Sequence, residues 1–144
     1  MPSYEVSAQT TASPERVFAI VADGAGWSRW AGPVVVRSWW EREGTPPPGG
    51  IGAIRALGLK RIGSREEIVA YDPPHHLGYT LLSGMPVRGY RADVRIEPDG
   101  TGSRIVWGGS FEPKLPGTAG ALRLFFRTAV GGFLKRLAAE AERA

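Results

Sequence analysis

One strand-like segment combines two polar side chains with an apolar face. In residues 88–97 the apolar side chains, Ala92 and Val94 among them, alternate with charged ones, so their face must point to the interior. Arg88 and Tyr90 share that parity and are predicted to point inward, nearer the open end of the strand. An inward arginine can polarise a carbonyl or orient a carboxylate, and an inward tyrosine can donate a proton.

A third candidate polar side chain, a carboxylate, lies in the predicted strand 65–71. Glu66 shares the parity of Ile68, and if the face of Ile68 is the inner one, Glu66 is an inward carboxylate and a candidate base. The candidate catalytic residues are therefore Arg88, Tyr90 and Glu66. Two plainer interpretations stay open, namely that Arg88 reaches solvent from the strand end and that Glu66 is an edge-strand carboxylate.

Aromatic and apolar side chains from other segments complete a predicted pocket. Alternation turns Tyr79 and Leu81 inward from one strand and Trp107 inward from the last strand. Apolar walls with a few polar anchors are the usual composition of a small-molecule site, although ordinary core packing would use the same residues. The predicted ligand-binding residues are Tyr79, Leu81, Arg88, Tyr90, Trp107, Phe126, Val130 and Phe133.

Other kinds of site chemistry lack the residues that they need. The chain has no cysteine, which excludes a disulfide framework, a thiolate metal site and a thiol nucleophile. The two histidines, His75 and His76, are adjacent in a proline-flanked turn and do not supply three or four convergent metal ligands. No Gly-x-Ser-x-Gly elbow occurs, and the glycine-rich stretches lack the setting of a nucleotide-binding loop. We therefore predict no metal and no cofactor.

The elements that must position these residues are short strands and one long helix. Apolar residues recur at helical spacing from Gly117 to Arg143, with Pro116 before the start and Thr118 as the expected N-cap. A short helix should begin after Ser13, followed by a helical turn near residues 27–33. Strands are expected at 4–10, 34–43, 51–57, 65–71, 77–82, 88–97 and 104–112. We therefore predict an α+β fold, with a curved antiparallel sheet around the C-terminal helix.

Two local features bear on movement and assembly. Gly131 and Gly132 lie off the apolar stripe of the long helix and each cost about 1 kcal/mol of helix stability relative to alanine. They are a candidate pivot, unless close packing against a neighbouring loop requires them. Trp39 and Trp40 must face opposite sides of their strand, so one of them is exposed or covered by a partner. This pattern suggests a homodimer.

The length and composition of the chain predict one globular domain over residues 1–144. Apolar residues make up 42% and charged residues 22% of the chain. The net charge is +4, but the arginines are scattered, so we predict no nucleic-acid partner. The first residues lack a signal-peptide pattern, and no apolar run reaches the length of a membrane span. This predicts a cytoplasmic protein without stable membrane insertion.

The order of the elements, with four local signatures, resembles the START-related helix-grip superfamily (SRPBCC), in particular its polyketide cyclase/dehydrase and lipid transport branch. The stretches that carry the resemblance are 12–18, 66–74, 94–102 and 102–113, together with the terminal helix. The resemblance implies a seven-stranded sheet that grips the C-terminal helix, two short helices after the first strand, and an apolar tunnel for a hydrophobic or aromatic ligand. No catalytic residue is shared across that superfamily, so the resemblance assigns none here.

Three functions are compatible with this interpretation. The first is a carrier that binds a hydrophobic small molecule, such as a lipid, an acyl chain or a polycyclic aromatic, with Arg88 orienting a polar group. The second is a polyketide aromatase/cyclase, with Arg88 as the polarising group, Tyr90 or Tyr79 as the proton donor and Glu66 as the base. The third is an interaction module, which only the basic charge supports. We favour the carrier and leave open whether the protein is an enzyme.

Overall fold

The computed structural model describes residues 2–32, 35–59 and 63–143. Its strands are β1 (Ser3–Thr10), β2 (Val35–Arg42), β3 (Ile54–Leu59), β4 (Gly63–Asp72), β5 (His76–Ser83), β6 (Val87–Asp99) and β7 (Gly102–Pro113). Its helices are α1 (Pro14–Ala22), the 3-10 turn η1 (Gly24–Gly26), α2 (Trp27–Trp30) and α3 (Ala119–Glu142). The expected strand–helix–strand order is therefore confirmed, with strand ends that differ by a few residues.

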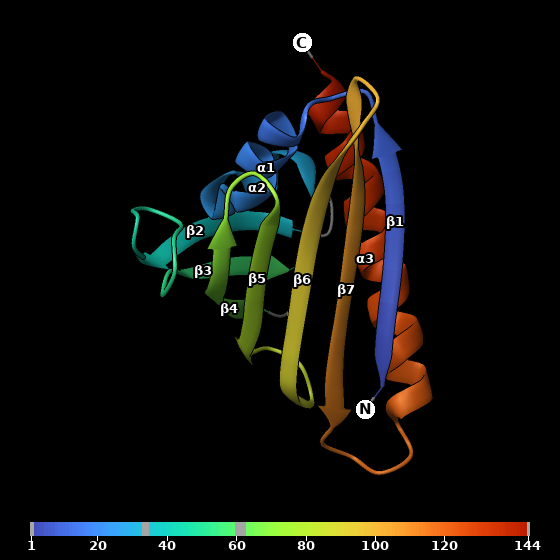
Figure 1. Ribbon diagram of the computed structural model, residues 1–144. Coiled ribbons are helices and arrows are strands. Elements are labelled where there is room, and N and C mark those ends of the chain that lie inside the picture. Colours follow the sequence, from blue (N-terminus) through green and yellow to red (C-terminus); the bar gives the residue numbers. More distant parts are fainter. Residues whose placement is uncertain (1, 33–34, 60–62, 144) are drawn as a thin grey trace.

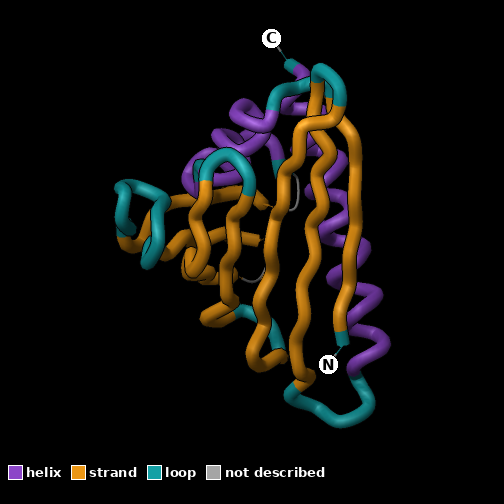
Figure 2. The backbone as a smooth tube through the Cα atoms, viewed as in Figure 1, coloured by secondary structure: helices purple, strands orange, loops and turns teal. Residues whose placement is uncertain are grey.

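The seven strands form one antiparallel sheet in the order β1-β7-β6-β5-β4-β3-β2. The sheet bends strongly, so that β2 and β3 run across the longer strands, beneath α1 and α2 (Figure 1). Helix α3 runs along β1 and β7 on one face of the sheet, and the turns of the β4–β5 and β6–β7 hairpins point toward the same end (Figure 2). The predicted α+β architecture, a seven-stranded sheet with a C-terminal helix, is confirmed.

Helix α1 begins as its sequence predicts. The backbone N–H of Arg16 donates to the side-chain oxygen of Ser13 at 3.2 Å, and Pro14 occupies the first turn. Val17 and Val21 are fully buried on the inner face of α1. The following turns bring Trp27 into the core, where its indole Nε1 donates to the carbonyl oxygen of Val21 at 3.0 Å. These short helices therefore close one end of the sheet with a tryptophan.

Helix α3 buries Phe126, Val130, Leu134, Leu137 and Ala141. The inward orientation predicted for Phe126 and Val130 is confirmed. Phe133 is only half-buried, and its neighbour Leu134 is buried more deeply. Thr118 occupies the N-cap position, although its hydroxyl donates to the carbonyl oxygen of Leu115 at 2.6 Å and not to the helix. Among the described residues, no helix has the length and apolarity needed to cross a bilayer.

Candidate functional site

A small cavity lies between helix α3 and the inner face of the sheet. Its volume is about 80 Å³, and its walls are mostly aromatic and aliphatic. The lining residues are Trp27, Leu57, Ser64, Glu66, Tyr79, Leu81, Met85, Tyr90, Phe125, Phe126, Ala129, Val130 and Phe133. Glu66 and six of the predicted ligand-binding residues, namely Tyr79, Leu81, Tyr90, Phe126, Val130 and Phe133, are thereby brought together. Trp107 lies behind the cavity wall, where its indole Nε1 donates to the hydroxyl of Tyr79 at 3.1 Å.

The inward orientation predicted for Arg88 is wrong. Between Arg88 and Arg91, β6 advances three residues while its partner β7 advances two, so β6 carries a bulge. Gly89 has a φ of 59° in this bulge, a left-handed conformation that glycine adopts without strain. The extra residue reverses the alternation, so that Tyr90 is buried while Arg88 is exposed. Arg88 therefore cannot act as the polar anchor of this cavity.

The polar anchor of the cavity is Glu66, which a second residue holds in place. Ile68 is buried on the inner face, which makes Glu66 an inward carboxylate, as the sequence analysis proposed for that case. Arg55 lies directly opposite Glu66 in the β3–β4 register, and its Nε donates to Oε1 of Glu66 at 2.8 Å. Both residues are buried, with Glu66 at 8% and Arg55 at 0% exposure. The ion pair therefore lies in the core and stabilises a carboxylate beside an apolar cavity.

Arg55 was not among the predicted site residues, and its strand parity is the one sequence signal that points to it. It shares the parity of Ala53 and Leu57, and both of these belong to the hydrophobic core. The guanidinium Cζ of Arg55 lies 4.3 Å from the ring centre of Trp27 and 4.6 Å from that of Tyr79. Its Nη1 donates to the carbonyl oxygen of Val21 at 3.3 Å, whereas its buried Nη2 has no partner among the described residues.

Three buried tyrosines, Tyr4, Tyr79 and Tyr90, retain their protons. Burial raises the pKa of Tyr79 well above its ordinary value, and the charge of Glu66 raises it further. Burial is also the main cause of the raised pKa of Tyr90 and of Tyr4. The hydroxyls of Tyr4 and Tyr90 share a hydrogen bond. The tyrosines near the cavity can therefore donate hydrogen bonds but are poor bases at neutral pH.

The first half of α3 forms one wall of the cavity. Phe125 and Ala129 line both the cavity and an apolar groove on the outer side of the helix. Phe125 is 49% exposed and Leu124 beside it is 65% exposed. Sites for drug-sized ligands commonly have about 300–1,000 Å³, so this cavity is small, and admitting a larger ligand requires these side chains to move.

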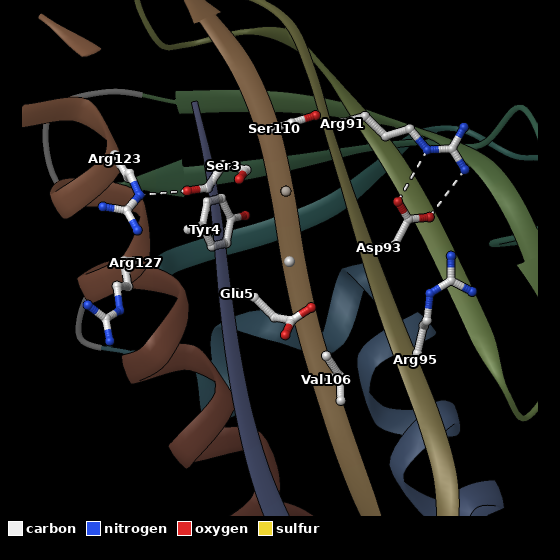
Figure 3. Close-up of a pocket in the computed structure, with 12 residues that line it drawn as sticks. Ser3, Tyr4, Glu5, Arg91, Asp93, Arg95, Val106, Ser110, Arg123 and Arg127 are labelled. Atoms are coloured by element: carbon white, nitrogen blue, oxygen red, sulfur yellow. Dashed lines mark hydrogen bonds and ion pairs between the residues drawn. The ribbon is translucent and has the colours of Figure 1, made fainter. Parts of the chain in front are cut away.

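A larger hollow than this cavity lies on the opposite face of the sheet (Figure 3). It is an open groove of about 620 Å³ over β1, β7 and β6, and its floor is low because Gly108 has no side chain between Glu5 and Asp93. Arg91 donates to Asp93 at 3.2–3.3 Å, and Arg123 donates from α3 to the carbonyl oxygen of Ser3 at 2.8 Å. Because this surface is open and several of its charges bond to groups of the chain itself, we place the candidate site in the inner cavity.

The histidines take no part in the cavity. His75 is exposed, and His76 lies on the outer face, where its Nε2 is 2.6 Å from Oδ1 of Asp93. Burial raises the pKa of Asp93, but hydrogen bonds from Arg91 and His76 outweigh burial and hold that pKa below its ordinary value. Among the residues that the structure describes, no three His, Asp or Glu side chains converge as a metal site would require.

Comparisons with known proteins agree on the fold. The family model described as "Polyketide cyclase / dehydrase and lipid transport" matches residues 1–142. The uncharacterized protein Rv2574 of Mycobacterium tuberculosis is 28% identical over 127 residues, which cover 86% of this chain and 72% of that protein. A START superfamily protein from Mycobacterium smegmatis superposes with a TM-score of 0.83 over 97% of each chain at 15% identity. TTHA0849 from Thermus thermophilus superposes with a TM-score of 0.78 over 97% of each chain at 20% identity.

Proposed function

This chain belongs to the polyketide cyclase/dehydrase and lipid transport family, within the START-related helix-grip superfamily, and we propose that it binds a hydrophobic small molecule in the cavity between its sheet and α3. The observation that carries the proposal is a cavity with aromatic walls and one buried carboxylate. Apolar surface that a ligand buries there contributes about 25 cal/mol per Å² to binding, and the polar group fixes its orientation.

A ligand larger than the cavity enters, in this proposal, by displacing the first half of α3. Phe125 and Ala129 form the thin part of the wall. Gly131 and Gly132 follow directly along the helix, and neither has a packing reason to be glycine. A Cβ at Gly131 would meet only Val6, at 3.9 Å, and a Cβ at Gly132 would meet only the flexible end of Arg136, at 3.3 Å. Tight packing against a loop therefore does not explain them, which supports their role as a pivot.

The alternative, a polyketide aromatase/cyclase, has partial support from the same residues. Glu66, Tyr79 and Tyr90 face one cavity, and the tyrosines retain the protons that a carbonyl oxygen would accept. The cationic group that was expected to polarise the carbonyl, Arg88, is exposed, and Arg55 is enclosed behind Tyr79. Binding therefore fits the site better than cyclisation does.

Three narrower predictions from the sequence stay predictions, namely lipid transport, a cytoplasmic location and a homodimer. For the homodimer, Trp39 is the exposed tryptophan of the pair, at 44%, and it lies beside Arg37. Trp40 instead packs against Gly24 and Gly49, where an added Cβ would lie 2.8–2.9 Å from its ring. Sedimentation velocity of the wild type and of Trp39→Gln tests the dimer, which this substitution should dissociate.

Native mass spectrometry of the protein purified without denaturation tests the proposed function. We expect a bound small molecule on the wild type and a much lower occupancy on Val130→Phe, which fills the cavity from α3. The matched control is Val36→Phe, because Val36 is 54% exposed on β2 and is not part of the cavity lining. Thermal melting of all three proteins checks that Val130→Phe still folds, since overpacking costs about 1–3 kcal/mol. Equal occupancy on Val130→Phe, or no bound molecule on any protein, would contradict the proposal.

A further inference from the structure

The buried ion pair presents only its negative member to the cavity. Glu66 lines the cavity, whereas Arg55 does not. The guanidinium of Arg55 is enclosed at 0% exposure between the rings of Trp27 and Tyr79. A ligand in the cavity therefore meets the carboxylate first and is separated from the cation by an aromatic ring.

The hydrogen-bonding capacity of the carboxylate is only partly used. Oε1 of Glu66 accepts from Nε of Arg55, and the hydrogen bond and ion pair that Glu66 makes to the described residues both use Oε1 and leave Oε2 available. The hydroxyl of Tyr79 accepts from Trp107 and keeps its own O–H as a neutral donor, while the hydroxyl of Tyr90 is bonded to Tyr4. The strongest unused group at the cavity is thus an acceptor, and it bears a negative charge.

From this polarity we infer the chemical class of the ligand, given the proposed function on which the inference rests. The ligand is a small aromatic or apolar molecule whose buried end donates a hydrogen bond to Glu66 through a hydroxyl or an amine. A ligand with a carboxylate at that end is excluded, because it would place a second negative charge beside the buried Glu66 among mostly apolar side chains.

The remaining walls favour the same class. The rings of Tyr90 and Phe126 lie 4.9 Å apart at the cavity, and Phe133 packs edge-on against Trp27 at 5.7 Å. Ring faces carry negative electrostatic potential, which attracts the positive edge of an aromatic donor or an ammonium group. The cavity therefore presents a negatively charged acceptor to the ligand. The sequence analysis had expected a positively charged donor, Arg88, which would select a ligand with a carboxylate or a carbonyl.

Calorimetric titration with three single-ring probes tests the inference, because phenol, toluene and benzoate differ mainly in the group that would reach Glu66. For the wild type we expect phenol to bind about tenfold more tightly than toluene, the lower end of what a hydrogen bond to a charged group contributes. Benzoate should bind more weakly than either. Tighter binding of benzoate, or equal binding of phenol and toluene, would overturn the inference while leaving the proposed function in place. Failure of phenol and toluene alike to bind would instead overturn the proposed function.

A double variant keeps the test independent of folding defects. Glu66→Gln alone leaves Arg55 buried without a counter-charge and is at risk of unfolding. Arg55→Met/Glu66→Leu replaces the whole pair with apolar side chains, an exchange that is often neutral for stability. In this variant toluene binding should be retained while the preference for phenol disappears. A preference for phenol that survives in the double variant would assign donor recognition to the tyrosines and overturn the role of Glu66.

Discussion

Arg55 and Glu66 occupy directly paired positions on β3 and β4, and Nε of Arg55 lies 2.8 Å from Oε1 of Glu66. The side chain of Arg55 is 0% exposed and that of Glu66 is 11% exposed. Buried pairs of this kind are not strongly stabilising in themselves, but breaking one leaves an uncompensated charge in the core. The pair therefore ties the stability of the fold to the polarity of the cavity.

The first prediction concerns the cost of breaking this pair. Arg55→Met should lower the free energy of unfolding by about 3 kcal/mol, because the carboxylate of Glu66 would be left in the core without its cation. Urea denaturation followed by tryptophan fluorescence measures the change. Arg65→Met is the matched control, since Arg65 pairs with Glu41 at 2.6 Å on the surface of the same sheet. Because that pair is exposed to solvent, its loss should cost much less than the loss of the buried pair. Equal losses in the two variants would contradict the prediction.

The second prediction concerns the hydrogen bond behind the cavity wall. Tyr79→Phe removes the only hydroxyl that accepts from Nε1 of Trp107 among the described residues and leaves a buried donor unpaired. This should cost about 1–3 kcal/mol of unfolding free energy. A double-mutant cycle with Trp107→Phe isolates the hydrogen bond from the loss of packing, and a coupling energy near ~1 kcal/mol is expected. Additive losses, with no coupling, would show that the contact is not a functioning hydrogen bond.

The third prediction concerns the glycine pair in α3. Gly131→Ala and Gly132→Ala should each raise the free energy of unfolding by about 1 kcal/mol, because alanine favours the helix and both positions have room for a methyl group. If the pair is the pivot of the helix, the double variant should also bind phenol more slowly in stopped-flow measurements while its affinity changes little. Unchanged association rates would exclude the pivot without affecting the stability prediction.

The fourth prediction concerns alkaline pH. Burial, the largest cause, raises the folded-state pKa of Tyr4, Tyr79 and Tyr90 above the unfolded value of about 10. The folded chain therefore holds protons that the unfolded chain releases. Their contribution to stability is complete below about pH 10 and is lost as the pH rises further. In a near-ultraviolet absorbance titration, three of the four tyrosines should ionise only together with unfolding. Ionisation of Tyr4, Tyr79 and Tyr90 near pH ~10 in folded protein would contradict this.

Much of the fold could be predicted from local sequence patterns. The site could be predicted only in part, because it also depends on a strand bulge and on strand register. Strand alternation correctly predicted that Tyr79 and Tyr90 point inward, because the apolar residues on the same face of each strand must be buried. It failed at Arg88, since the bulge at Gly89 adds one residue that parity counting does not include. A glycine beside an arginine in a strand was the available signal of that bulge.

The pairing of Glu66 with Arg55 could not be predicted from the sequence, for a different reason. Parity alone would have placed Arg55 inward with Ala53 and Leu57. The pairing of Arg55 with Glu66 also needs the β3–β4 register, which depends on the geometry of the connection and not on the composition of either strand. The cavity volume could not be predicted at all, because it is the small difference between a curved sheet and the side chains that fill it.

The most direct test of the central claim is a titration of isotope-labelled protein with phenol, followed by amide and side-chain NMR shifts. We predict that the largest shifts cluster at Glu66, Tyr79, Tyr90 and Val130, which line the cavity between the sheet and α3. Shifts that cluster instead at Arg91, Arg95 and Gly108, on the opposite face of the sheet, would contradict the account.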